Sequence, residues 1–188
     1  MRSISIVIVT AVVILLLLVL VALLVIYTGA YNVAATDGHR GAVSWLLTTT
    51  SERSVARQAR GVGQVVLPID STSLARGHRA YEKMCVVCHG APGVDPGWMG
   101  EGMVPSPPDL SQIARIRSTE EIYWVITHGI KFAGMPALTP THAEEEIREL
   151  TAFVVQLGEM SDADYAAWRR AAAVDTAAVA DDGHDHVH

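Results

Sequence analysis

The sequence predicts an all-α protein with one long apolar helix at its N-terminus. Ile4 to Tyr27 is an almost unbroken apolar run, interrupted only by Ser5 and Thr10. Later segments repeat apolar residues at helical spacing behind residues that favour helix N-termini, and no βαβ pattern is visible. These observations favour a small helical domain that follows a membrane-spanning helix.

The composition limits the number of domains and the class of partner. The chain has 188 residues, half of them apolar, which leaves room for one domain with extensions but not for two full domains. Much of the apolar content lies in the first thirty residues. The formal net charge of −6 argues against a nucleic-acid partner.

The apolar run is long enough to cross a bilayer. Its 24 residues would extend about 36 Å as a helix, against a hydrocarbon core of about 30 Å. A cleaved signal peptide is the alternative, but its apolar region usually has only about 7–15 residues. Small residues at Thr28–Ala30 and Val33–Ala35 would suit signal-peptide cleavage, so this alternative stays open. We assign residues 1–30 to a single-pass anchor, which makes the lipid bilayer the first expected partner.

Residues 31–70 form a juxtamembrane connector. Tyr31 and Trp45 suit a membrane interface, and 41–60 predicts one helix or a pair of short helices. Three arginines recur there at helical spacing and form a basic stripe: Arg53, Arg57 and Arg60. The stripe fits anionic lipid head groups, an acidic partner or a solvated helix face, and the sequence does not choose among them.

The central motif is Cys85-Val86-Val87-Cys88-His89, which contains both cysteines of the chain. C-x-x-C-H is typical of c-type haem attachment, because residues three apart on a helix share one face and both thiols reach the same ligand. A redox dithiol would want a βαβ pattern around the cysteines, and a zinc site would want further ligands at suitable spacing. Neither is visible in the sequence.

Two further stretches accompany this motif, Pro105–Leu110 and Gly134–Pro136. Through these three features the segment from about Ser71 to Gly158 resembles class I monohaem c-type cytochromes. It is most similar to those attached to bacterial respiratory membranes, including the cytochrome c subunit of high-affinity haem-copper oxidases. The resemblance implies a cytochrome c fold over residues 71–158 and one covalent haem c. It also implies a haem domain on the periplasmic, extracytoplasmic side of the cytoplasmic membrane.

Helix signals within 71–158 are consistent with that fold. Ser71 or Ser73 is expected to cap a first helix, in which the resemblance implies that Gly77 and Tyr81 cross the last helix closely. Ala91 to Met103 is expected to be irregular. Ser118-x-x-Glu121 is a capping box that opens a helix ending at Gly129.

The last helix is expected from Thr141 or His142 to Leu157. Its apolar residues recur at helical spacing and predict a buried stripe of Ile147, Leu150, Phe153, Val154 and Leu157. Its glutamates are expected to face water: Glu144, Glu145, Glu146 and Glu149.

His89 is expected to bind the haem iron on one side and Met135 on the other. Pro136 biases Met135 towards extended backbone, and Gly134 allows a close approach of the chain. Met99, Met103 and His128 are the rival ligands. The resemblance implies that a proline carbonyl accepts the other ring N–H of His89, and the candidates are Pro105, Pro107 and Pro108. Trp98, Tyr123 and Trp124 either line the haem or are ordinary core and surface aromatics.

The C-terminal region predicts a short helix and a tail. Residues 159–174 contain a capping box at Ser161 and Asp164, followed by Tyr165 and Trp168. Residues 175–188 are expected to be a disordered His-rich tail. Weak transition-metal binding by its histidines competes with simple solvation: His184, His186 and His188.

These features predict an electron-transfer protein rather than an enzyme, because both axial positions of the iron have a candidate ligand. The expected function is single-electron transfer to redox partner proteins of a respiratory chain. One alternative is the cytochrome c subunit of a multi-subunit oxidase or dehydrogenase. Another is a haem sensor with an open sixth site.

Overall fold

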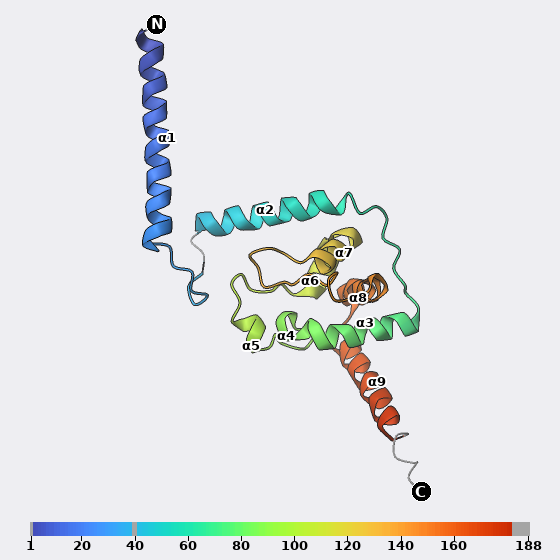
Figure 1. The fold of residues 1–188 in the computed structure, drawn as a ribbon. Coiled ribbons are helices and arrows are strands. Elements are labelled where there is room, and N and C mark those ends of the chain that lie inside the picture. The colour runs from blue at the N-terminus through green and yellow to red at the C-terminus, as the bar shows by residue number, and fades with distance from the viewer. Residues whose placement is uncertain (1, 39–40, 182–188) are drawn as a thin grey trace. The chain divides into compact units, whose positions relative to one another are not determined.

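The computed structural model describes residues 2–38 and 41–181, and every named element in these ranges is helical, as expected (Figure 1). The chain divides into two compact units, 1–37 and 38–188. The elements are α1 Arg2–Thr28, α2 Gly41–Ala59, α3 Ser71–Met84, α4 Val86–His89, α5 Trp98–Glu101, α6 Leu110–Ile116, α7 Thr119–His128, α8 Glu144–Gln156, the 3-10 turn η1 Leu157–Glu159 and α9 Asp162–Asp181.

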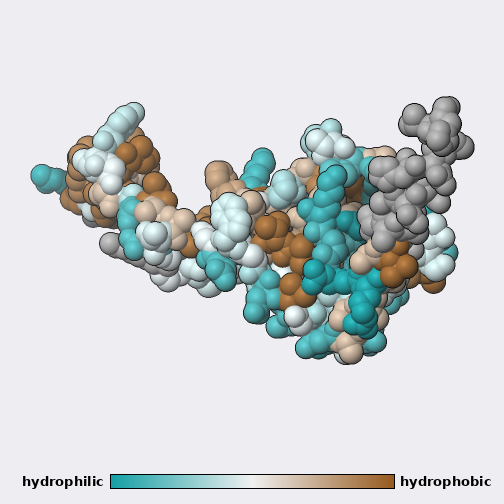
Figure 2. All heavy atoms as spheres, turned by 90° about the horizontal axis from the view of Figure 1, so that it is seen from below, coloured by the Kyte–Doolittle hydropathy of each residue, from teal (hydrophilic) through white to brown (hydrophobic). Residues whose placement is uncertain are grey.

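The first unit consists of α1 and the turn that follows it. The helix has 27 residues and is long and apolar enough to cross a membrane, by length and composition. Its large apolar side chains are exposed along its whole length, and hydrophobic residues are visible around it in the end-on view of Figure 2. A signal sequence near an N-terminus would have the same length and apolar character.

In the second unit, the connector forms one helix rather than two. Helix α2 contacts α7 and buries Val55 and Ala59. Its Glu52 carboxylate lies 3.5 Å from the Arg117 guanidinium, next to the start of α7. The C-terminal half of α2 therefore packs against the helical domain.

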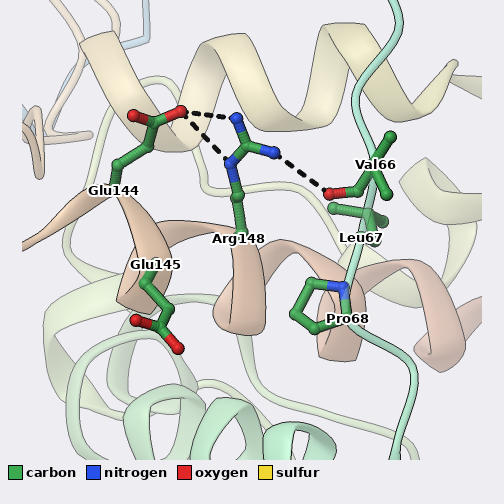
Figure 3. A pocket seen from close by; sticks show the side chains of 6 residues that line it. All are labelled: Val66, Leu67, Pro68, Glu144, Glu145 and Arg148. Atoms are coloured by element: carbon green, nitrogen blue, oxygen red, sulfur yellow. Dashed lines mark hydrogen bonds and ion pairs between the residues drawn. The ribbon is translucent and has the colours of Figure 1, made fainter.

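The chain between α2 and α3 then runs beside α8. Arg148 Nη1 donates to the Val66 carbonyl at 3.3 Å, and Arg148 Nη2 donates to Glu144 Oε1 at 2.6 Å. Figure 3 shows these side chains around a shallow surface pocket beside Pro68. The Arg148 guanidinium lowers the pKa of the Glu144 carboxyl by hydrogen bonding.

Helix α3 is capped by Asp70, not by Ser71 or Ser73 as the sequence suggested. Asp70 has extended backbone, and its Oδ1 accepts from the N–H groups of Thr72 and Ser73 at 3.1 and 3.0 Å. Asp70 therefore accepts hydrogen bonds from the free N–H groups at the start of α3, the role that was expected of a serine. Its carboxylate also suits the positive end of the helix dipole.

Helices α3 and α8 pack against each other (Figure 1), and Gly77 marks the point of closest approach. A Cβ added at Gly77 would lie 2.2 Å from the Glu149 carbonyl oxygen and 2.8 Å from its carbon. Only glycine allows two helix backbones to approach this closely. The close crossing that the resemblance implied is therefore present, and Tyr81, one turn further along α3, is fully buried beneath it.

Helix α8 begins at Glu144, later than expected, with Ala143 as its N-cap. The N–H groups of Thr141 and His142 instead donate to the Leu138 carbonyl, both at 2.9 Å, and form a turn. The Ala143 N–H donates to Glu146 Oε2 at 2.9 Å, so a side chain from inside the helix satisfies its start. The predicted apolar stripe is buried: Ile147, Leu150, Phe153, Val154 and Leu157.

Glu149 is buried, which corrects the expectation that it faces water. Arg76 of α3 binds its carboxylate through both Nε and Nη2, with Nε at 2.7 Å from Oε1. Arg76 Nη2 also donates to Ser73 Oγ at 3.1 Å. Hydrogen bonding to Glu149 raises the pKa of Arg76. The pair joins α3 to α8 beside Gly77.

Helix α9 packs on α3 and runs to Asp181, beyond the expected end at residue 174. Its capping box is present, because Ser161 N–H donates to Asp164 Oδ2 at 2.9 Å and Asp164 N–H donates to Ser161 Oγ at 3.3 Å. Tyr165 is fully buried, and its hydroxyl donates to Glu82 Oε1 at 2.7 Å. The histidines 184, 186 and 188 lie outside the described residues.

A histidine lies buried where α9 meets α3. His78 is 1% exposed, and its ring contacts those of Phe153, Tyr165 and Trp168. Its Nε2 has no hydrogen-bond partner among the described residues, and Glu82 Oε1 lies 3.8 Å away. Burial lowers the pKa of His78, and the charges that act on it are those of Glu82, Arg169 and Arg79.

Candidate haem-binding site

The C-x-x-C-H motif forms one helical turn at the junction of α3 and α4. Cys85 is at once the C-cap of α3 and the N-cap of α4. The N–H groups of Cys88 and His89 donate to the Cys85 carbonyl at 3.0 and 2.9 Å. This turn brings the two thiols to one face, as two thioether bonds to one planar ligand require. Both thiols are free and half-buried.

Burial raises the pKa of the Cys85 thiol to about 12, with a smaller contribution from Cys88. A dithiol that works by disulfide exchange needs the opposite, a thiol pKa that its surroundings lower. The environment of Cys85 therefore argues against a thioredoxin-like function for this C-x-x-C pair.

The imidazole of His89 has a fixed orientation. Its Nδ1 lies 2.8 Å from the Pro108 carbonyl oxygen. Since a carbonyl only accepts, Nδ1 carries the proton and Nε2 keeps the lone pair that a metal needs. Burial lowers the pKa of His89, which favours this neutral, metal-binding form. Among the candidate prolines, the structure brings the carbonyl of Pro108 to the ring.

Helix α6 holds Pro108 in place, and sequence reasoning missed this helix. Asp109 is its N-cap, with Oδ1 accepting from Ser111 N–H at 2.8 Å and from Ser111 Oγ at 2.7 Å. At the far end of the helix, Arg115 Nε donates to the Gly158 carbonyl at 2.7 Å. The sequence pattern that could have predicted α6 is Asp109 directly after Pro107-Pro108, because aspartate is a favourable N-cap at the start of a helix.

The chain after the motif wraps tightly around it. Tyr81 Oη donates to the Gly90 carbonyl at 2.6 Å, within the buried core. Gly90 has φ of +63°, and Gly100 lies so close to α4 that an added Cβ would be 2.3 Å from the Cys88 carbonyl oxygen. Gly100 belongs to the short helix α5, which corrects the expectation that 91–103 is wholly irregular. Trp98 of α5 is 77% exposed.

The loop that carries Met135 closes on itself. Gly129 ends α7 with φ of +65°, and the Ile130 N–H donates to the Met135 carbonyl at 3.2 Å. An added Cβ at Gly134 would lie 1.6 Å from the Met103 methyl group. The segments of Met135 and Met103 are therefore neighbours, and Met103 stays the main rival ligand.

The remaining candidates lie on α5 and α7. Met99 is 41% exposed on α5, and His128 is exposed at the end of α7. The His128 ring lies 5.0 Å from that of Trp124, centroid to centroid. Tyr123 packs against the core cluster. Met99 and His128 therefore stay rival candidates for the sixth ligand.

Comparison with known families identifies the domain. The family model described as cytochrome c oxidase, cbb3-type, subunit III matches residues 72–154, from the first turn of α3 to near the end of α8. Residues 72–154 are therefore a c-type cytochrome domain that is similar to this family. No curated protein sequence matches the chain significantly.

The side chains of this cytochrome domain fit a covalently bound haem c. Two half-buried free thiols lie on one helical turn, and the adjacent imidazole has its Nε2 available. Cys85, Cys88 and His89 would hold the group, which when bound supplies a one-electron redox couple. The domain is thus an electron-transfer module.

Proposed function

We propose that the chain is a membrane-anchored c-type cytochrome that passes single electrons in a respiratory chain. In this proposal one covalent haem is bound by Cys85 and Cys88 and ligated by His89 and Met135. The orientation of His89 by the Pro108 carbonyl is the observation that carries the proposal, because an axial histidine needs a fixed ring with Nε2 free.

Met135 is proposed as the sixth ligand from its setting. A thioether ligand stabilises ferrous iron and raises the reduction potential, which suits a carrier that keeps both ligands through the redox cycle. The Ile130–Met135 hydrogen bond restrains the loop, and the half-buried Met135 lies between Gly134 and Pro136. Met103 competes because its methyl group lies against Gly134.

Visible spectroscopy of the full-length holoprotein tests the ligand set. Met135→Ala should abolish the weak far-red band that methionine sulfur gives on ferric haem and produce a high-spin spectrum. The matched control Met103→Ala should keep the band. If Met103→Ala loses the band and Met135→Ala keeps it, Met103 is the ligand. If neither variant changes the spectrum, methionine ligation by this pair is wrong.

The membrane anchor in this proposal is α1, with the cytochrome domain on the periplasmic side of the cytoplasmic membrane. Support comes from the length and apolar character of the helix. The intact mass of the protein purified from membranes tests the assignment, since a processed signal peptide would remove α1 and release the chain from the membrane.

A second function is favoured by the description of the matching family, which names a subunit of an oxidase. In that case the domain would pass electrons inside a multi-subunit complex and would not travel independently. Purification after mild solubilisation separates the two functions. Co-elution with large haem- or copper-containing subunits indicates a subunit, whereas elution as a small independent protein indicates a carrier.

A further inference from the structure

Helix α2 has two faces with different surroundings. Val55 and Ala59 are buried against the helical domain, and Figure 1 shows α7 running obliquely beneath the C-terminal half of α2. Each residue of a helix turns by about 100°, so Arg53 and Arg57, each two positions from Val55, point to the opposite side. Leu46, nine positions before Val55, lies on that same outer side.

The exposed side chains of α2 are uncharged in its first half and include arginines in its second, and Trp45 and Leu47 lie about 100° to either side of the outward-facing Leu46. Residues 41–51 contain no charged side chain, and three large apolar side chains there are exposed: Trp45 at 68%, Leu46 at 56% and Leu47 at 40%. Arg53 and Arg57 have no ion-pair partner among the described residues, and Arg60 Nε donates only to the Ala56 carbonyl of its own helix. The one acidic residue of α2, Glu52, lies beside Arg117 instead.

We propose that the outer side of α2 lies on the surface of an anionic lipid bilayer, with Leu46 in the interface, Trp45 and Leu47 on its two flanks, and Arg53 and Arg57 at the phosphate groups. Exposed Trp and Leu next to unpaired arginines are the features of helices that bind in the plane of a membrane. In a chain with a net charge of −6, the stretch 41–60 carries three arginines against one glutamate, an excess of two positive charges.

The connection to α1 favours lipid over an acidic protein, and this step rests on the proposed anchoring by α1. Twelve residues, 29–40, separate α1 from α2, and a chain of that length spans at most about 40 Å. The tether therefore keeps α2 near the bilayer at high effective concentration. Because the inner face of α2 packs on α7, lipid contact at the outer face would orient the cytochrome domain on the membrane.

The test is hydrogen–deuterium exchange of the full-length holoprotein in lipid nanodiscs. Amides of residues 41–60 should exchange more slowly in discs containing phosphatidylglycerol than in discs of phosphatidylcholine alone, and added salt should reduce the difference. The double variant Arg53→Gln/Arg57→Gln should remove most of this difference in exchange, because each arginine near an anionic surface strengthens lipid binding about fivefold. The matched control Arg79→Gln/Arg170→Gln removes the same charge from exposed sites on α3 and α9 and should leave the difference intact.

Two results would overturn the inference. One is equal exchange of residues 41–60 in both kinds of disc. The other is protection that appears only in native membranes with a co-purifying acidic protein, which would make α2 a protein-docking helix. Incorporation of the holoprotein into discs is scored separately, because a chain that fails to incorporate refutes the anchor rather than the role of α2.

Discussion

Replacing Gly77 with alanine should destabilise the cytochrome domain, because this residue sets the distance between α3 and α8. The new Cβ would lie 2.2 Å from the Glu149 carbonyl oxygen, 2.8 Å from its carbon and 3.0 Å from the Phe153 Cβ. Two of these atoms are backbone, so the clash is relieved only when one helix moves by about 1 Å, given that contacts closer than about 3.4 Å between such atoms are repulsive.

The magnitude follows from two opposing effects. Forcing an extra methyl into a packed core costs about 1–3 kcal/mol, and a backbone clash belongs at the upper end of that range. Alanine in place of glycine in a helix interior returns about 1 kcal/mol. The expected net loss is about 2 kcal/mol, which for a domain of this size lowers Tm by about 10 °C.

Thermal unfolding of the full-length holoprotein in detergent, followed by circular dichroism of the haem band, measures this loss. Gly41→Ala is the control, because no atom lies within 4 Å of the added Cβ at the start of α2. It should leave the transition unchanged. A Gly77→Ala protein as stable as Gly41→Ala would show that α3 and α8 do not cross at Gly77.

Three further perturbations test other contacts of the fold. Arg76→Ala should lower the free energy of unfolding in denaturant by about 1–3 kcal/mol, since it leaves the buried Glu149 carboxylate unpaired. The double variant Arg76→Leu/Glu149→Leu should recover much of this loss. A double variant no more stable than Arg76→Ala would contradict the argument. Burial lowers the pKa of His78 from 6.5, so its contribution to stability is complete above pH 6.5 and declines as the pH falls below it. His78→Phe should therefore flatten the curve of stability against pH between pH 7 and about pH 5. An unaltered slope would show that the pH dependence does not come from His78. Ser118→Ala removes the acceptor of the Glu121 N–H at 3.2 Å and should cost about 1 kcal/mol, whereas unchanged stability would mean that the capping box contributes nothing.

The features that sequence reasoning predicted well are local. The apolar run of α1 and the capping box at Ser118 depend on residues within one or a few helical turns. The helical turn of the C-x-x-C-H motif is equally local, because Cys88 and His89 follow Cys85 by only three and four residues. The buried stripe of α8 follows from periodicity alone.

The features that sequence reasoning missed depend on residues far apart along the chain. Glu149 looks like a solvated residue on an acidic helix until Arg76, 73 positions earlier, is brought against it. The choice of Pro108 over Pro107 as the acceptor for His89 depends on how α6 starts, which no spacing rule for the haem motif contains. The burial of His78 is not visible in the sequence, because it comes from the packing of α8 and α9 on α3.

Taken together, the contacts of α3 explain why the haem motif needs the whole domain. Cys85 follows directly from α3, so its position is set by whatever fixes that helix. The Gly77 crossing fixes its middle, and the Tyr81 hydroxyl ties its last turn to the Gly90 carbonyl on the far side of the motif. The turn of the two cysteines and His89 is thus held at both ends, while α6 presents the Pro108 carbonyl from a third direction. A displacement of α3 should therefore change the orientation of the His89 imidazole as well as the stability of the fold.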